Sequence, residues 1–176
     1  MKTTNDRLFG AALVLLLSLV GGSDSAVGAT ATSSFTVTGT VTAMCTISAT
    51  GLSFNYDPVG ANAGAAQPAT AQGQLTLACT KGSSPSIGLD AGANAANAPS
   101  GSPRAMKMTI GATSTYLGYD LRWPGTTTSW TTASPYVPSA PTSKAARVFN
   151  MDGIVPGNQD VGVGTYNDTV TATVNF

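Results

Sequence analysis

Apolar and polar residues alternate along two long stretches of the chain, one near each end. From Phe35 to Ile47 the odd positions are apolar or small, and five of the six even positions are threonine. From Tyr166 to Phe176 most even positions are apolar, and every odd position is threonine or asparagine. Alternation with a period of two residues, rich in β-branched side chains, is typical of β-strands with one buried face. The sequence therefore predicts a strand near each end.

Shorter apolar segments lie between these two stretches, separated by linkers rich in Gly, Pro, Ala, Asn and Ser. The expected strands are Leu52–Tyr56, Gln74–Thr80, Ser86–Asp90, Ala105–Ile110, Tyr116–Trp123 and Arg147–Met151. The expected loops are Val59–Gln72, Ala91–Pro103, Pro124–Ser143 and Pro156–Gly164. Several short strands with turn signals between them predict an all-β protein of the β-sandwich type.

The first alternating stretch is too long for one strand of a small sandwich. Its 13 residues would span about 43 Å, whereas strands usually have roughly 3–10 residues. Either the strand bends, with a kink at Gly39, or its first half pairs with another chain. If the C-terminal stretch is the penultimate strand of a seven-stranded sandwich, its edge and an apolar groove stay open. A projecting strand would cover that groove by β-strand addition.

The first thirty residues have the pattern of an export signal. Two basic residues come before or at the start of an apolar run from Leu8 to Val20, which is shorter than the roughly 20 residues of a membrane-spanning helix. Small residues follow, so we expect a signal peptide cleaved after Ala29, with Ala26 as the second choice. The alternative is an uncleaved N-terminal anchor.

Composition narrows the classes of function. The chain has 8 Lys and Arg and 8 acidic residues, all of them Asp, so the formal net charge is zero, and there is no His. Without His, catalytic triads and imidazole metal ligands are excluded, and without a basic excess nucleic-acid binding is not expected. We therefore expect neither an enzyme nor a protein with a cofactor.

Two cysteines, Cys45 and Cys79, both follow the expected signal. In an oxidising compartment an even pair predicts one disulfide, which closes a loop of about 35 residues and contributes roughly 3–4 kcal/mol. Two free buried thiols are the alternative.

Weaker signals point to other chemistry. The Asp152–Asp160 segment resembles a calcium loop but lacks the alternating acids and the closing Glu. Trp123, Trp130 and Tyr136 would be able to stack on sugar rings, although a Trp123 in the core and a Trp130 on a loop surface are the more ordinary outcome. A self-contained secreted sandwich that binds glycans is therefore the second hypothesis, with residues 35–47 as a bent internal strand.

In their order along the chain, these segments resemble the spore coat protein U domain family, which includes the major pilins of archaic chaperone–usher pili. The matching segments are residues 35–47, Leu52–Tyr56, Leu75–Cys79, Tyr119–Trp123 and Gly164–Phe176. The resemblance covers essentially all of the chain after the expected signal.

The resemblance implies an incomplete immunoglobulin-like β-sandwich completed by donor-strand complementation. Residues 1–29 would be the signal peptide, 30–44 the donor-strand extension and 45–176 the domain. A periplasmic chaperone would supply the missing strand, and at an outer-membrane usher the extension of the next subunit would replace it. The donor face implied by position is Phe35, Val37, Gly39, Val41 and Ala43. The implied acceptor groove is Val170, Ala172, Val174 and Phe176.

The function implied by the resemblance is that of a secreted structural subunit. It would pass through the periplasm to the cell surface, a fimbrium or the medium, and polymerise with copies of itself or related pilins. Such polymers support adhesion and biofilm formation. We expect no nucleic-acid partner and no stable membrane insertion after signal removal.

Overall fold

The computed structural model describes residues 28–176 and divides the chain after Gly39. In the first unit the described residues, 28–39, form no helix and no strand. The expected signal peptide lies almost entirely outside the described residues. Among those that are described, no helix is long and apolar enough to cross a membrane.

The second unit, Thr40–Phe176, is built of antiparallel strands with one short 3₁₀ turn. The elements are β1 (Cys45–Thr50), β2 (Ala69–Cys79), β3 (Ser86–Leu89), η1 (Ala95–Asn97), β4 (Arg104–Ile110), β5 (Thr113–Arg122), β6 (Arg147–Val155) and β7 (Ala172–Asn175). The prediction of an all-β protein is confirmed.

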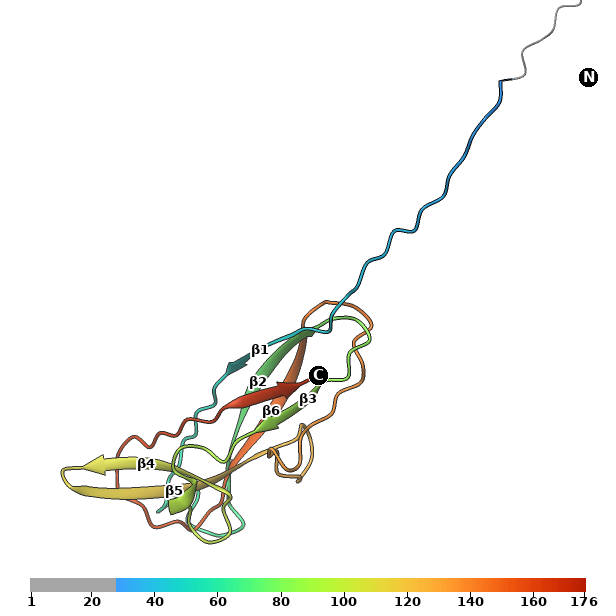
Figure 1. The fold of residues 1–176 in the computed structure, drawn as a ribbon. Helices are drawn as coiled ribbons and strands as arrows, with labels where there is room; N and C mark the ends of the chain where they lie inside the picture. Colours follow the sequence, from blue (N-terminus) through green and yellow to red (C-terminus); the bar gives the residue numbers. More distant parts are fainter. Residues whose placement is uncertain (1–27) are drawn as a thin grey trace, which may run out of the picture. The chain divides into compact units, whose positions relative to one another are not determined.

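Two antiparallel sheets make up this unit (Figure 1). Five strands pair in the order β1-β2-β6-β5-β4, and β3 pairs with β7. An immunoglobulin-type sandwich places three strands in its second sheet, with the last strand beside the penultimate one. In the described part of the chain β7 has a neighbour on one side only, so the immunoglobulin-like sandwich is one strand short, as predicted.

The core lies between the two sheets and follows the alternation of the strands. On β2 the side chains of Leu75, Leu77 and Cys79 are buried, while Gln74 faces solvent. Each fully buried leucine contributes on the order of 1.5–3 kcal/mol relative to an exposed one. Trp130 is also fully buried, and its Nε1–H donates to the Ile87 carbonyl at 2.7 Å. The expectation that Trp130 lies on a loop surface is therefore wrong.

The segment Leu52–Tyr56 crosses the inner face of the sheet without pairing into it, so its predicted strand is not formed. Leu52 and Phe54 lie close over two glycines of β2 and β6. A Cβ atom at Gly153 would come within 2.6 Å of Phe54 Cζ, and one at Gly73 within 3.2 Å of Leu52 Cγ. The glycines therefore provide the room that lets this segment lie against the sheet.

The other predicted strands are confirmed, with shifted ends. β2 begins at Ala69 rather than Gln74, because residues 69–73 pair with β6 although their small and polar side chains resemble a loop. Of the alternating stretch 35–47 only the part from Cys45 onward is a strand, because residues 28–44 enter no ladder and β1 begins at Cys45. The bent internal strand is therefore not formed. At the other end only residues 172–175 form β7, because β3 is just four residues long.

Candidate functional site

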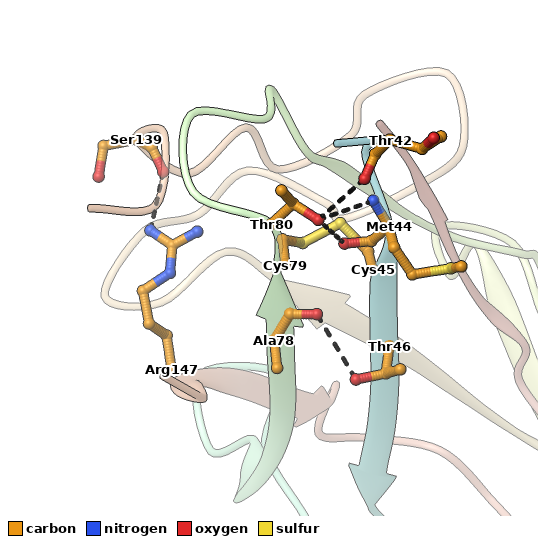
Figure 2. The surroundings of a disulfide bond; sticks show 9 residues. All are labelled: Thr42, Met44, Cys45, Thr46, Ala78, Cys79, Thr80, Ser139 and Arg147. Atoms are coloured by element: carbon orange, nitrogen blue, oxygen red, sulfur yellow. Dashed lines mark hydrogen bonds between the residues drawn. A yellow bond between two sulfur atoms is a disulfide. The ribbon is translucent and has the colours of Figure 1, made fainter. Parts of the chain in front are cut away.

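The start of β1 is fixed to the end of β2 by the disulfide between Cys45 and Cys79, as predicted from the paired cysteines. The two residues face each other directly in the ladder, with 4.1 Å between their Cα atoms. Figure 2 shows Thr80, the residue after the disulfide, beside the chain that enters β1. The Thr80 backbone N–H donates to the Met44 carbonyl at 2.8 Å. This corner therefore anchors residues 44 and 45 to β2.

The C-terminal stretch hydrogen-bonds through its backbone toward one side. Asn167 exchanges two bonds with Lys107 of β4, at 2.8 and 3.0 Å, and the Thr171 carbonyl accepts from the Asp90 N–H at 3.0 Å. In an antiparallel ladder alternate residues bond to the same neighbour, so the even-numbered residues of 168–174 direct their backbone groups to the other side. Within the described residues no strand pairs with that edge.

An apolar groove of about 380 Å³ runs between this open edge and the end of β1. One wall is the segment 49–54, and the other wall is the segment 166–172. Its floor is made of side chains that belong to the core: Leu75, Leu89, Leu121 and Met151. Unpaired backbone and core side chains thus lie open together, which is the arrangement that accepts an added strand.

A second hollow of about 540 Å³ continues the groove toward residues 161–165. The two hollows share the lining residues Leu52, Phe54, Met106, Tyr166 and Asn167. The predicted strand Leu52–Tyr56 is thus a wall of the groove, a role that its alternation did not reveal.

Of the four predicted acceptor residues, Val170 and Ala172 line the groove, whereas Val174 and Phe176 lie beyond its lining. Val170, Ala172 and Val174 are half-buried and pack against the core, whereas 50% of Phe176 is exposed. The odd-numbered threonines between them face solvent. The alternation therefore predicted correctly that Val170, Ala172 and Val174 turn inward, but not that Phe176 is exposed. The role of these residues as an acceptor stays a prediction.

The predicted donor residues are exposed. The exposed fractions are 87% for Phe35, 83% for Val37 and 84% for Val41, and Ala43 is exposed as well. An added Cβ at Gly39 would meet nothing within 4 Å. A soluble protein rarely leaves three large apolar side chains so close in sequence uncovered, and such a feature marks an interaction segment.

Asp168 fixes the first half of the C-terminal stretch by its side chain. Its carboxylate accepts from the Tyr119 hydroxyl at 2.7 Å and from the Asn94 amide at 2.9 Å. Burial raises the pKa of Tyr119 above its ordinary value, and the hydrogen bond to Asp168 adds to the shift, so the hydroxyl stays a donor. The part of the C-terminal stretch that precedes the β3–β7 ladder is thereby held in place.

Asp90 holds the middle of the same stretch. Its carboxylate accepts the backbone N–H groups of Thr171 and Gly92, both at 3.0 Å. Burial by itself would raise the pKa of Asp90, but these two hydrogen bonds hold it below its ordinary value. The carboxylate is therefore charged where it caps the end of the β3–β7 ladder.

Arg104 is fully buried and hydrogen-bonds to the residue that follows β3. Its guanidinium donates to the carbonyls of Asp90 and Trp130, at 2.7–3.0 Å, and lies 3.6 Å from the Asp120 carboxylate. Burial lowers the pKa of Arg104, and the charge of Asp120 opposes that shift. These bonds connect β4 to the end of β3 and to the loop before β6. They therefore hold in place the strand β3 against which the C-terminal stretch pairs.

The sequence-based alternatives find little support. Asp152 of the suspected calcium loop accepts hydrogen bonds from Gln72 and Gly125, and the described residues contain no cluster of three metal-ligating side chains. Of the three aromatics considered for sugar stacking, Trp130 is buried in the core, and Trp123 packs edge-on against Tyr136 at 5.9 Å. No exposed aromatic platform is built from them.

Comparison with known proteins agrees with the open sandwich. The family model of the Spore Coat Protein U domain matches residues 31–173, so the chain belongs to the Spore Coat Protein U domain family. No curated protein sequence matched the chain.

One solved structure with a similar fold is the CsuC–CsuE chaperone–tip adhesion subunit pre-assembly complex from the archaic chaperone-usher Csu pili of Acinetobacter baumannii. The TM-score is 0.53 and the sequence identity 22%, over 78% of this chain. The chain spans 41% of the matched chain, and at this identity the similarity concerns the fold.

Proposed function

We propose that the protein is a non-enzymatic structural subunit of a surface pilus or coat, which polymerises by donor-strand exchange. The observation that carries the proposal is the apolar groove beside β7, floored by core leucines and flanked by unpaired backbone. A sandwich with such an opening needs a strand from outside to become stable and soluble.

Residues 35–43 of a second copy are the proposed donor. Their apolar side chains alternate with threonine, so one face would fill the groove while the other faces solvent. Nine residues in extended form span about 27 Å, and the acceptor stretch 166–174 has the same length. Burial of Phe35, Val37 and Val41, now almost fully exposed, would contribute on the order of 5–8 kcal/mol as an upper estimate.

The same groove would need protection before assembly. We infer that a periplasmic chaperone lends a strand to it and that an outer-membrane usher exchanges this strand for residues 35–43 of the next subunit. Membership of the Spore Coat Protein U domain family supports this route, as does the fold shared with a complex described as chaperone plus pilus subunit. Surface display, adhesion and biofilm formation would follow from the polymer.

A charge on the donor face tests the proposal. In the full-length chain expressed with its export signal, Val37→Asp and Val41→Asp should abolish SDS-resistant oligomers, because an unpaired carboxylate would enter the groove. Thr38→Asp and Thr40→Asp are matched controls, since they add the same charge to the outer face and should still assemble. A wild-type chain that is a stable monomer at high concentration would refute polymerisation.

A further inference from the structure

A chain that carries both a groove and a strand able to fill it can block itself. β1 and β7 are in contact and lie on opposite sides of the groove. In Figure 1 the arrow of β1 and the red arrow of β7, next to the C-terminus, run in opposite directions. A chain reversal just before Cys45 would therefore place residues 35–43 next to β1, inside the groove of the same molecule. Intramolecular insertion has a high effective concentration, on the order of millimolar for a short connection, so it would outcompete a second copy unless it is prevented.

The side chain of Thr80 opposes this reversal. Its hydroxyl oxygen accepts the Met44 backbone N–H at 3.1 Å, and its hydrogen lies within reach of the carbonyl oxygens of Thr42 and Met44, both at 3.4 Å (Figure 2). Together with the backbone bond from the Thr80 N–H to Met44, these contacts keep residues 42–44 in line with β1 and beside the end of β2.

The residues just before Cys45 are also unsuited to a tight turn. A two-residue hairpin turn needs positive φ angles, which glycine, asparagine and aspartate supply, whereas the residues between Thr42 and Cys45 are Ala43 and Met44. The disulfide fixes Cys45 to Cys79, so the reversal cannot move into β1. The nearest glycine is Gly39, and a turn there would remove half of the donor segment.

We propose that Thr80 is a positioning residue that prevents residues 35–43 from entering the groove of their own chain and so reserves the groove for a second copy. This inference rests on the proposed function, because it presumes that residues 35–43 are the donor. Thr80 would thus favour the donor segment of a second copy over the identical segment of its own chain. The absence of a turn-forming residue at positions 43 and 44 disfavours insertion into the own chain as well.

The test compares full-length secreted chains by size-exclusion chromatography and by amide exchange of residues 35–43. Thr80→Val keeps the shape and removes the hydroxyl, and it should raise the ratio of monomer to polymer about three- to tenfold, the effect of losing one hydrogen bond. Adding Ala43→Asn and Met44→Gly to Thr80→Val supplies a hairpin turn and should make the monomer predominant. In both monomers residues 35–42 should exchange slowly.

Two variants control for folding. Thr80→Ser keeps a hydroxyl and should behave as the wild type, and Thr46→Val removes a similar cross-strand hydroxyl, 3.5 Å from the Ala78 carbonyl, without touching residues 42–44. Polymerisation of the triple variant to the wild-type extent would overturn the role of Thr80 and leave the proposed function standing. So would variant monomers in which residues 35–42 exchange rapidly. A wild-type monomer with rapid exchange in this segment would instead overturn the proposed function, and with it this inference.

Discussion

The two alternating stretches of the chain have nearly the same pattern and different structures. Residues 166–176 turn Val170, Ala172 and Val174 onto the core and bond to β3 and β4 along one edge. Residues 35–43 place their apolar side chains at the odd positions in the same way, but Phe35 and Val37 are more than four-fifths exposed and no ladder forms. The side chains of one stretch pack on the core of the domain, and those of the other are exposed.

Alternation thus predicts the capacity to form a strand, whereas the available partner decides whether the strand exists. Both stretches have threonine on one face and so the same intrinsic preference for extended backbone. A single strand gains no cross-strand pairs and buries no side chains, so preference alone does not hold it. Under the proposed function, the first stretch becomes a strand when the groove of a second copy supplies its partner.

The largest effect on assembly is expected from a charge placed on the groove face of the acceptor stretch. Ala172→Asp introduces a carboxylate into the half-buried groove wall, and we expect loss of assembly, measured as SDS-resistant oligomers of the secreted chain. Thr173→Asp, on the exposed face of the same strand, is the matched control and should assemble. Equal assembly by both variants would mean that the groove face of β7 carries no partner.

A smaller effect should follow when the anchor between the first stretch and the domain is removed. Replacement of both Cys45 and Cys79 by alanine should lower the free energy of unfolding by about 3–4 kcal/mol, because the unfolded chain regains the entropy of a long loop. Guanidinium unfolding under non-reducing conditions measures it. A variant with an unchanged midpoint would contradict the stabilising role of this bond.

The side-chain support of the second stretch gives an effect of about 1–2 kcal/mol. Tyr119→Phe removes the 2.7 Å hydrogen bond to Asp168 and leaves a half-buried carboxylate with one fewer donor. We expect a lower unfolding midpoint and faster amide exchange in residues 166–171. Tyr116→Phe, on the opposite face of β5, should change neither quantity. A silent Tyr119→Phe would show that the stretch is held by its backbone bonds alone.

The smallest effect is expected from acid. The pKa of Asp90 is held below its ordinary value near 3.8, so its charged form stabilises the fold above that pH, and the stabilisation is lost as pH falls through the lowered pKa. Thermal unfolding monitored by circular dichroism should be flat from neutral pH to about pH 4 and decline below it. Asp90→Asn should flatten the decline. A decline centred near neutral pH would contradict this assignment.

Asp57, which lines neither hollow, offers a comparison with Asp90. The backbone N–H groups of Gly60, Ala61 and Val59 hold the pKa of this exposed carboxyl below its ordinary value. Asp57→Asn should therefore alter the same acid limb of the unfolding curve, yet leave the acid resistance of the oligomers as in the wild type. Asp90→Asn, which weakens the hold on Thr171 of the groove wall, should lower the acid resistance of the oligomers. An equal loss in Asp57→Asn would contradict the link between Asp90 and the groove wall.

Much of the fold was predictable because short-range pattern determines it. Alternation predicted the strands and the inward side chains Val170, Ala172 and Val174, and an even cysteine count after an expected export signal predicted the disulfide. The start of β2 was missed because residues 69–73 have loop-like side chains and are strands only by pairing with β6.

The less predictable features depend on partners far away in the sequence. The burial of Arg104 follows from carbonyl acceptors on Asp90 and Trp130, which no side-chain pattern reveals. The burial of Trp130 likewise depends on a distant partner, the Ile87 carbonyl that accepts from its Nε1–H. Thr80 is one threonine among many, and only the fold places its hydroxyl against residues 42–44.

Amide hydrogen exchange on the secreted, assembled protein decides whether the first stretch becomes a strand in the groove. Residues 35–43 should exchange as slowly as β2 in the assembly, and their protection should disappear in Val37→Asp, while Thr38→Asp retains it. Rapid exchange of residues 35–43 in intact oligomers would contradict donor-strand exchange, because the oligomers would then be held by another surface.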